Sequence, residues 1–244
     1  MSQQVVVVVT GAGSGIGRIL SRGLLAAGHR VVLAGRRADA LQESAQSHAS
    51  AIAIPTDVRD SGSVAELFQA VDERCGRVDV LINNAGVFGR PAAVDEITDA
   101  DWTNALATNV SGAVYCAREA VQRMKPAGGG RIINNASISA HVPRPRSLAY
   151  TTTKHAITGL TKSINLDGRA FGISATQLDI GNAASAMTAG MTEALQPDGT
   201  KRAEPTFDPA HLNGLVNNLI ALPVEVAVPE LMVMATGMPF FGRG

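Results

Sequence analysis

The stretch "TGAGSGIG" brings four glycines together within eight residues, directly after a run of five valines. Glycine has no side chain, so a phosphate can approach the N–H groups at the start of a helix, where the helix dipole also favours negative charge. The spacing Gly11-x3-Gly15-x-Gly17 differs from the common dinucleotide pattern G-x-G-x-x-G, and the Gly-Lys-Ser/Thr of nucleotide-triphosphate loops is missing. The stretch therefore predicts a pyrophosphate-binding turn, with a merely flexible turn as the less favoured alternative.

Two arginines follow the next apolar run, in "LAGRRAD". NAD enzymes usually place an acidic residue at this point, because a carboxylate binds the ribose 2′-hydroxyl. Here Gly35 is followed by Arg36 and Arg37, and a guanidinium can bind a 2′-phosphate through two hydrogen bonds. The pair favours NADP(H) over NAD(H), with Arg36 nearer the end of the predicted strand. The alternative is two solvated arginines at the start of a helix.

A third set of candidates lies farther along the chain. Tyr150 and Lys154, in "YTTTK", are four residues apart and would share one face of a helix, although this spacing is common by chance. Tyr150 comes 13 residues after Ser137, which follows a predicted strand. Asn109 lies in "TNVSG", and "NNAG" at 83–86 ends another predicted strand. The sequence thus contains five motifs at predicted strand ends or on predicted helices.

Strands and helices must position these residues, and the hydrophobic pattern alternates between the two along the whole chain. Short turns link them, which predicts a doubly wound parallel sheet with ligands bound at the carboxyl ends of its strands. The predicted strands are Val5–Val9, Val31–Ala34, Ala51–Ile54, Val78–Asn83, Arg131–Asn135, Ile173–Leu178 and Leu231–Met234. The predicted helices are Ile16–Ala27, Ala38–His48, Ser63–Cys75, one from about Thr98 to Met124 with a possible break, and one that follows Tyr150 and ends near Gly172. The segment 181–217 is predicted to be irregular or loosely helical.

Composition limits the class of protein. The chain has 244 residues, a formal net charge of zero, 45% hydrophobic residues and 4% aromatic residues. This length suits one α/β domain over 1–244, and the lack of a basic surplus disfavours a general affinity for nucleic acid or anionic membranes. The two cysteines lack C-x-x-C spacing, and no signal-peptide pattern or membrane-length apolar run is present. We therefore predict a soluble cytoplasmic protein.

Together the five motifs resemble the short-chain dehydrogenase/reductase family, in its compact subclass, over nearly the whole chain. The resemblance implies a single-domain α/β fold with a Rossmann-type sheet of about seven parallel strands and helices on both faces. It also implies an NAD(P)-dependent oxidoreductase that interconverts a secondary alcohol and a ketone or aldehyde by hydride transfer.

The resemblance assigns catalytic roles to Asn109, Ser137, Tyr150 and Lys154. Tyr150 would give a proton to the substrate oxygen during reduction and take it back during oxidation. Free tyrosine titrates near ~10, so Lys154 would stabilise the phenolate with its positive charge, and it would also hold the nicotinamide ribose. Ser137 would orient the substrate oxygen. Asn109 would break its helix and hold a water that links Lys154 to solvent.

Four groups of residues would hold the cofactor, according to the same resemblance. The pyrophosphate and adenosine ribose would be bound by Gly11, Gly13, Ser14, Gly15, Ile16 and Gly17. Asp57 and Val58 would contact the adenine. The central sheet would be braced, and the cofactor lined, by Asn83, Ala85 and Gly86. The nicotinamide would be covered by Ile180, Gly181, Ser185 and Thr188, with Ile180 standing where the family usually has proline. No metal is predicted, because the five histidines are scattered without a ligand cluster.

The substrate is predicted to be a small carbonyl or alcohol of unknown identity. Arg144 and Arg146 bracket a proline, and an arginine there would suit an anionic substrate or a carrier phosphate, although a solvated loop or a subunit contact is the favoured alternative. The segment 181–217 is predicted to form a substrate-binding flap. The residues expected to line the substrate pocket are Ser139, His141, Val142, Arg144, Met187 and Met191.

The resemblance further implies a homotetramer or homodimer, and Phe240 and Phe241 are expected to dock on a neighbouring subunit or on the chain itself. Two other functions remain as alternatives. An epimerase or dehydratase relative would need an added substrate domain, which this length does not supply. A non-catalytic NADP-sensing regulator should lack some of the four catalytic residues, yet all four are present.

Overall fold

The computed structural model describes residues 4–185, 188, 192–196 and 198–240. Its strands are β1 (Val6–Thr10), β2 (Arg30–Gly35), β3 (Ala51–Pro55), β4 (Val80–Asn83), β5 (Gly130–Asn135), β6 (Ile173–Ile180), β7 (Ala194–Leu195), β8 (Lys201–Arg202) and β9 (Glu230–Val233). Its α-helices are α1 (Gly15–Ala26), α2 (Ala38–Ala45), α3 (Ser61–Cys75), α4 (Asp99–Leu106), α5 (Gly112–Met124), α6 (Leu148–Gly168) and α7 (Leu212–Ala221). Shorter turns are the π-helical η1 (Ala107–Ser111) and the 3-10 turns η2 (Ile138–Ala140), η3 (Arg169–Phe171) and η5 (Pro209–His211).

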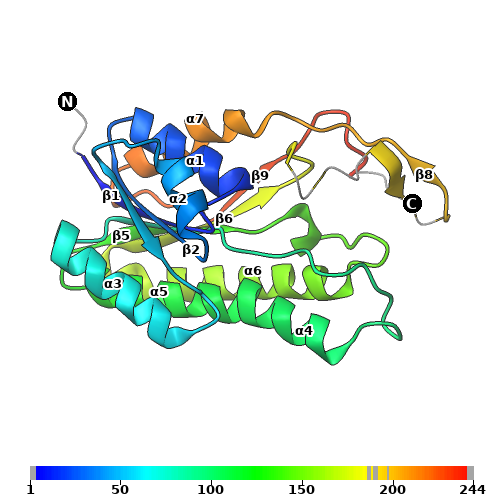
Figure 1. Cartoon of the computed structure of the whole chain (residues 1–244), viewed down its shortest axis with the longest axis horizontal. Helices are drawn as coiled ribbons and strands as arrows, with labels where there is room; N and C mark the ends of the chain where they lie inside the picture. The colour runs from blue at the N-terminus through cyan, green and yellow to red at the C-terminus, as the bar shows by residue number, and fades with distance from the viewer. Residues whose placement is uncertain (1–3, 186–187, 189–191, 197, 241–244) are drawn as a thin grey trace.

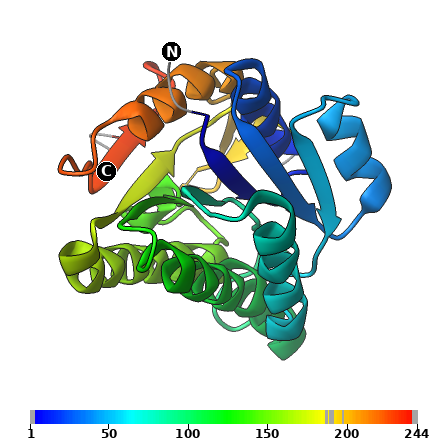
Figure 2. The same ribbon diagram turned by 90° about the vertical axis from the view of Figure 1, so that its left-hand side faces the viewer.

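Seven parallel strands form the central sheet, in the order β3-β2-β1-β4-β5-β6-β9. Helices α1, α2 and α7 cover one face, and α3, α5 and α6 cover the other (Figure 1; Figure 2). The direction of winding reverses between β1 and β4, which opens a crevice at the carboxyl ends of these strands. The predicted doubly wound, Rossmann-type sheet is therefore confirmed.

The valine run of β1 shows why the strands can be apolar throughout. Val7 and Val9 belong to the cluster that contains Leu24 of α1, whereas Val6 and Val8 belong to the cluster beneath α3 and α5. Successive side chains of a strand point to opposite faces, so a strand covered by helices on both sides buries every residue. Each strand can then end at the same edge with polar or small residues that face the crevice.

The segment from α4 to α5 is helical throughout but changes its hydrogen-bonding pattern in the middle. Thr98 caps its start, because the Thr98 hydroxyl oxygen accepts the N–H of Asp101 at 3.1 Å. The predicted break is present as the π-helical turn η1, which contains Asn109. Such wide turns are frequent at functional sites because they redirect a side chain.

Several predicted boundaries are wrong. Helix α6 begins at Leu148, so Tyr150 lies in its first turn and does not precede it. Helix α2 ends at Ala45 instead of His48, because Gln46 adopts a left-handed conformation with φ of 49°. Strand β6 extends two residues beyond its predicted end, to Ile180.

The segment 181–217 contains more regular structure than predicted. It includes the antiparallel pair β7–β8, the turn η5 and the beginning of α7. Leu212, Val216 and Leu219 of α7 are buried in the same cluster as Leu24 of α1. The apolar face of α7 therefore packs on α1. In the sequence, the polar residues between these positions make this apolar face hard to recognise.

At the end of the described chain, Phe240 packs against a small cluster formed by Ile138, Ala235 and Met238. This residue docks on its own chain, as one of the two alternatives expected, while Phe241 lies outside the described residues. Among the helices of the described ranges, none has the length and apolar character needed to cross a bilayer.

Candidate active site

A cavity of about 660 Å³ lies at the carboxyl edge of the sheet. The predicted residues that line it are Gly11, Gly13, Ser14, Gly15, Ile16, Arg36, Arg37, Asp57, Val58, Ala85, Gly86, Ser137, Ser139, Arg144, Tyr150, Lys154, Ile180, Gly181, Ser185 and Thr188. The predicted residues that are described but do not line it are Gly17, Asn83, Asn109, His141 and Val142. Met187 and Met191 lie outside the described residues.

The glycine turn is shaped by a close approach to the neighbouring strand. Gly11 has a φ of +66°, and a Cβ on it would come within 2.9 Å of the Cα of Ala85. A Cβ on Gly17 would overlap the carbonyl oxygen of Gly11, so this glycine permits the tight packing of α1 against the turn. Ser14 precedes α1 without capping it through its side chain, which leaves N–H groups of the first turn available to an anion. The turn therefore fits a pyrophosphate.

Hydrogen bonds between strand ends hold the floor of the cavity. The hydroxyl oxygen of Thr10 accepts the N–H groups of Asn84 and Ala85, both at 3.0 Å. Asn83 instead donates from its amide to Asn134 Oδ1 at 2.9 Å and to the carbonyl of Ala113 at 3.2 Å. Asn83 thus has the bracing position that was predicted for it but does not line the cavity.

The end of the cavity beside the carboxyl end of β2 has an excess of positive charge. Arg36 and Arg37 are exposed at its rim, and neither guanidinium forms an ion pair with any residue in the described part of the chain. Arg59, which the sequence analysis missed, also lines the cavity and pairs with Asp57 at 2.6 Å. The hydrogen bond from Arg59 lowers the pKa of Asp57. Two unpaired guanidinium groups therefore remain for an anionic ligand.

Tyr150 and Lys154 face the cavity from the first two turns of α6. The Lys154 ammonium lies 5.5 Å from the centre of the Tyr150 ring and donates from Nζ to the carbonyl of Asn135 at 2.7 Å. The Tyr150 ring also packs against Phe88, with ring centres 4.9 Å apart. Phe88 was not predicted, although it follows closely on the strand-end motif that contains Asn83.

Burial dominates the titration of both groups. Burial raises the pKa of Tyr150, and the negative charge of Asp179 acts in the same direction, whereas a hydrogen bond with Ser137 and the charge of Arg144 lower it. Burial lowers the pKa of Lys154 to about 8, with Asp179 opposing the change. At neutral pH the lysine is therefore a buried cation beside the Tyr150 ring.

Asn109 lies on η1, next to Thr153 of α6. Its Oδ1 accepts the N–H of Val87 at 2.8 Å, and its Nδ2 donates to the carbonyl of Val87 and to Thr153 Oγ1 at 2.9 and 3.0 Å. The side chain therefore ties η1 to the loop after β4 and to α6. Its predicted role in holding a water for Lys154 stays a prediction.

Arg144 has a buried partner that the sequence analysis did not anticipate. Its Nη2 donates to Glu204 Oε2 at 2.7 Å and to Asn182 Oδ1 at 2.8 Å. The Arg144 side chain is only 13% exposed, so it is not a solvated arginine, while the subunit contact in the same favoured alternative stays a prediction. Arg146 forms a more exposed ion pair with Glu96. The Arg144 pair connects the loop before α6 to the segment after β6.

We predict that this ion pair stabilises the protein in a pH-dependent way. Burial would raise the pKa of Glu204, but hydrogen bonds from Arg144 and Asn182 lower it to about 2 from 4.5. Because the folded pKa is depressed, the contribution should be complete above about pH 4.5 and be lost as the pH falls towards 2. Glu204→Gln should therefore lower the free energy of unfolding by about 1–2 kcal/mol at pH 7, and by progressively less below pH 4.5.

Urea denaturation of the parent and the variant across pH 2.5–7 measures this difference. Glu66→Gln is the matched control, because Glu66 is exposed on α3 and should change stability by less than about 0.5 kcal/mol. A difference between parent and Glu204→Gln that stays constant down to acidic pH would contradict the prediction.

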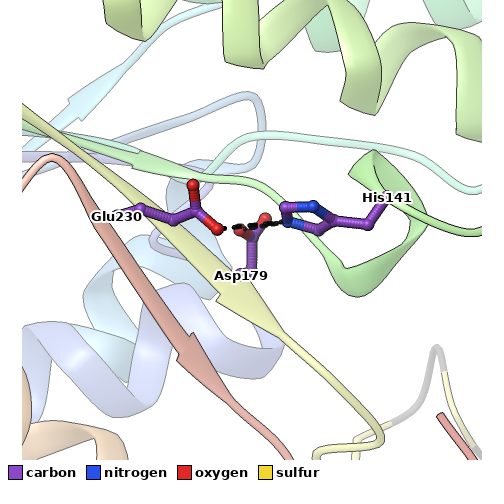
Figure 3. Close-up of side chains that lie close together, drawn as sticks. All are labelled: His141, Asp179 and Glu230. Carbon is purple, nitrogen blue, oxygen red and sulfur yellow. Dashed lines mark hydrogen bonds and ion pairs between the residues drawn. The ribbon is translucent and has the colours of Figure 1, made fainter. Parts of the chain in front are cut away.

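Asp179 is the most buried charged residue near the cavity, with no exposed surface at all. It accepts the backbone N–H of Ser137 at 3.2 Å and pairs with His141 Nε2 at 2.8 Å (Figure 3). His141 was predicted to line the substrate pocket, but it is not among the residues that line this cavity. Asp179 was not predicted, although a single acid within a strand buried on both faces is a sequence signal that could have found it.

Glu230 of β9 approaches the same nitrogen of the imidazole as Asp179, with its Oε1 3.6 Å from Nε2 (Figure 3). The ligand atoms of His141, Asp179 and Glu230 lie within 4.8 Å of one another, which is the kind of grouping that can hold a cation. Asp179 already accepts hydrogen bonds on both oxygens, so its place in the structure is explained by its protein partners.

Comparison with known proteins places the chain among related sequences. Residues 5–196 match the sequence family described as short chain dehydrogenase. Over 186 residues the chain is 37% identical to gluconate 5-dehydrogenase of Gluconobacter oxydans, and the aligned part covers 74% of this chain and 72% of that relative. Over 172 residues it is 36% identical to the 3beta-hydroxysteroid dehydrogenase of Mediterraneibacter gnavus, and the aligned part covers 69% of this chain but only 62% of that relative, less than two thirds.

The fold has close counterparts among solved structures. The crystal structure of a variant of actinorhodin polyketide ketoreductase with NADPH superposes with a TM-score of 0.85 and 28% sequence identity, and covers 96% of this chain and 98% of that one. The match of residues 5–196 to the family and the 37% identity to gluconate 5-dehydrogenase show that the chain belongs to the short chain dehydrogenase family.

Proposed function

We propose that the protein is an NADP(H)-dependent oxidoreductase that interconverts a secondary alcohol and a ketone or aldehyde. One observation is the main support: Tyr150, Lys154 and Ser137 meet on the same cavity that the glycine turn lines. The names of the relatives, a gluconate 5-dehydrogenase, a 3beta-hydroxysteroid dehydrogenase and a polyketide ketoreductase, all denote alcohol–carbonyl redox chemistry. Their substrates differ, so the reaction class is proposed here without a named substrate.

The residues of the cavity fit a dinucleotide. The first turn of α1 and the glycines before it would bind the pyrophosphate, and Arg36 and Arg37 would bind a 2′-phosphate. Lys154 would hold the nicotinamide ribose, and Ile180, Gly181, Ser185 and Thr188, which also line the cavity, would cover the nicotinamide. When bound, the cofactor would supply or accept the hydride.

The chain would perform the proton transfer. During reduction Tyr150 would donate its phenolic proton to the substrate oxygen, and during oxidation its phenolate would accept the alcohol proton. Lys154 would stabilise the phenolate electrostatically, which matters because burial raises the pKa of Tyr150. Ser137 would donate a hydrogen bond to the same substrate oxygen and so fix the carbonyl carbon in line for hydride transfer.

The unpaired arginines predict a measurable cofactor preference. A charge-assisted phosphate contact contributes roughly 1.5–3 kcal/mol, so NADPH should bind about ten- to a hundredfold more tightly than NADH in calorimetric titrations. Arg36→Ala should remove most of that preference by weakening NADPH binding alone. Arg74→Ala is the control, because Arg74 is an exposed arginine near the end of α3. Equal affinities of the parent for the two cofactors would show that Arg36 and Arg37 do not bind phosphate.

We further propose that the segment 181–217 covers the substrate. The Arg144–Glu204 pair supports this proposal, because it fastens that segment to the loop beside Tyr150. We also propose assembly into dimers or tetramers in the cytoplasm. The exposed apolar side chains of Val114 on α5 and Leu166 on α6 would suit contacts between copies.

A further inference from the structure

The carboxylate of Asp179 is fully buried close to the catalytic side chains, and such a charge is costly unless its partners compensate it. Its Oδ1 accepts the backbone N–H of Ser137 at 3.2 Å. Its Oδ2 accepts the side-chain amide of Gln177 and contacts Nε2 of His141, both at 2.8 Å. An ionised carboxylate can only accept hydrogen bonds, so we assign a proton to Nε2 of His141, which then donates to Asp179.

These contacts fasten both ends of one short turn. Ser137 begins the turn and its N–H is bound to Asp179, while His141 ends the turn and its side chain is bound to the same carboxylate. Backbone hydrogen bonds close the turn from within, including Ala140 N–H to the carbonyl of Ser137 at 2.7 Å. Asp179 therefore holds the turn 137–141 in place at both of its ends.

The turn determines what the Ser137 hydroxyl can do. Ser137 Oγ accepts the backbone N–H of Ser139 at 3.1 Å, which occupies one of its lone pairs and leaves its proton to be donated. A displacement of the turn would change both the position of this hydroxyl and the direction of its proton. His141 itself lies outside the lining of the cavity, so it acts on the site through the carboxylate of Asp179 and the turn that this carboxylate holds.

We propose that His141 and Asp179 form a positioning pair that holds the turn 137–141, and with it the Ser137 hydroxyl, in the geometry needed for hydride transfer. This proposal rests on the proposed function, because its principal readout is turnover. His141 acts as a positioning residue and does not touch the substrate. Its imidazole is 29% exposed at the side chain, so it can be replaced without opening the hydrophobic core.

A metal ion is the competing explanation for this cluster. His141, Asp179 and Glu230 supply one nitrogen and two carboxylates, which is a chemically reasonable ligand set. However, Asp179 Oδ2 already receives two N–H groups, and the glutamate is half exposed at 3.6 Å from the imidazole. Direct hydrogen bonding accounts for the buried charge, so we favour the pair over the ion.

The test compares His141→Ala with His141→Gln, whose side-chain amide can still donate to Asp179. We would measure kcat and KM for reduction of phenanthrenequinone by NADPH, the Kd of NADPH and the thermal midpoint. His141→Ala should lower kcat at least tenfold while KM and the Kd of NADPH change by less than about threefold, and His141→Gln should recover most of the loss. His48→Ala is the control, because this histidine lies exposed after α2, away from the cavity.

A second measurement does not depend on turnover. Amide hydrogen exchange of the segment 137–141, followed by mass spectrometry in the absence of substrate, should be faster in His141→Ala and near the parent rate in His141→Gln. A parent protein that fails to reduce the probe would count against the proposed function alone, because exchange would still test the pair. The pair is refuted if kcat and exchange are both unchanged in His141→Ala, or if His141→Gln is as impaired as His141→Ala. It is equally refuted if EDTA abolishes activity and Zn²⁺ or Mn²⁺ restores it.

Discussion

Tyr150→Phe should reduce kcat by a factor of about 10³, because the substituted ring has no proton to give and general acid–base catalysis contributes roughly 10²–10⁴-fold. The protein should remain folded, since Phe keeps the ring that packs 4.9 Å from Phe88. The Kd of NADPH should change little, because the glycine turn and Lys154 are untouched. Steady-state kinetics on any substrate that the parent accepts, together with a calorimetric titration of NADPH, measure these quantities.

The chain contains a natural control for this substitution. Tyr115 is the only other tyrosine and lies on α5, where Arg118 stacks over its ring at 5.5 Å. Tyr115→Phe should therefore leave kcat within about twofold of the parent. A Tyr150→Phe protein as active as the parent would remove the proton-transfer role and favour a cofactor-binding regulator on the same fold.

Lys154→Met should abolish activity and at the same time make the cofactor-free protein more stable. The folded pKa of Lys154 is about 8 instead of 10.5, which corresponds to about 3 kcal/mol against the charged form at neutral pH. Methionine removes that cost but also the hydrogen bond to the carbonyl of Asn135, which offsets about 1–2 kcal/mol. We expect a net gain of about 1–2 kcal/mol in the free energy of unfolding at pH 7.

The pH dependence of this gain has a definite sign. Between pH 8 and 10.5 the unfolded chain keeps the lysine proton while the folded chain loses it, so the parent becomes more stable as the pH rises through this window. The advantage of Lys154→Met should therefore be largest below pH 8 and shrink above it. Urea denaturation at pH 7, 8 and 9 measures the trend, with Lys162→Met on the exposed side of α6 as the control. A variant less stable than the parent at pH 7 would contradict the argument.

The sheet could be predicted because each of its strands has a recognisable local hydrophobic pattern. A run such as Val5–Val9 is compatible with a strand buried on both faces and with little else. The predicted limits of all seven strands of the main sheet agree with the observed ones to within two residues. Helix α7 could not be separated from its surroundings, because Asn213, Gly214 and Asn217 weaken its intrinsic helical preference. Its stability comes from packing on α1, which a linear sequence does not display.

The same distinction applies to the candidate site. Residues at strand ends and on one helix face were found because their spacing is short and regular. The contacts of Asp179 and Glu204 were missed because they join residues far apart in the chain: Asp179 is 42 residues from Ser137, and Glu204 is 60 residues from Arg144. No periodicity links such pairs. Only the fold brings the segment after β6 against the loop before α6.

The wide turn η1 has a consequence for the packing of the whole helical layer. A π-helical turn contains one residue more than an α-helical turn, and one extra residue rotates everything beyond it by roughly 100° about the helix axis. Helix α4, before the turn, packs against α6, whereas α5, after it, packs against α3 and against strands β4 and β5. The two halves of this continuous helical segment therefore pack against different neighbours through faces that are rotated relative to each other about the helix axis. The extra residue of η1 turns Asn109 towards Val87 and Thr153. It also rotates α5 relative to α4, so that one continuous helical segment can pack against two surfaces that a regular α-helix could not face together.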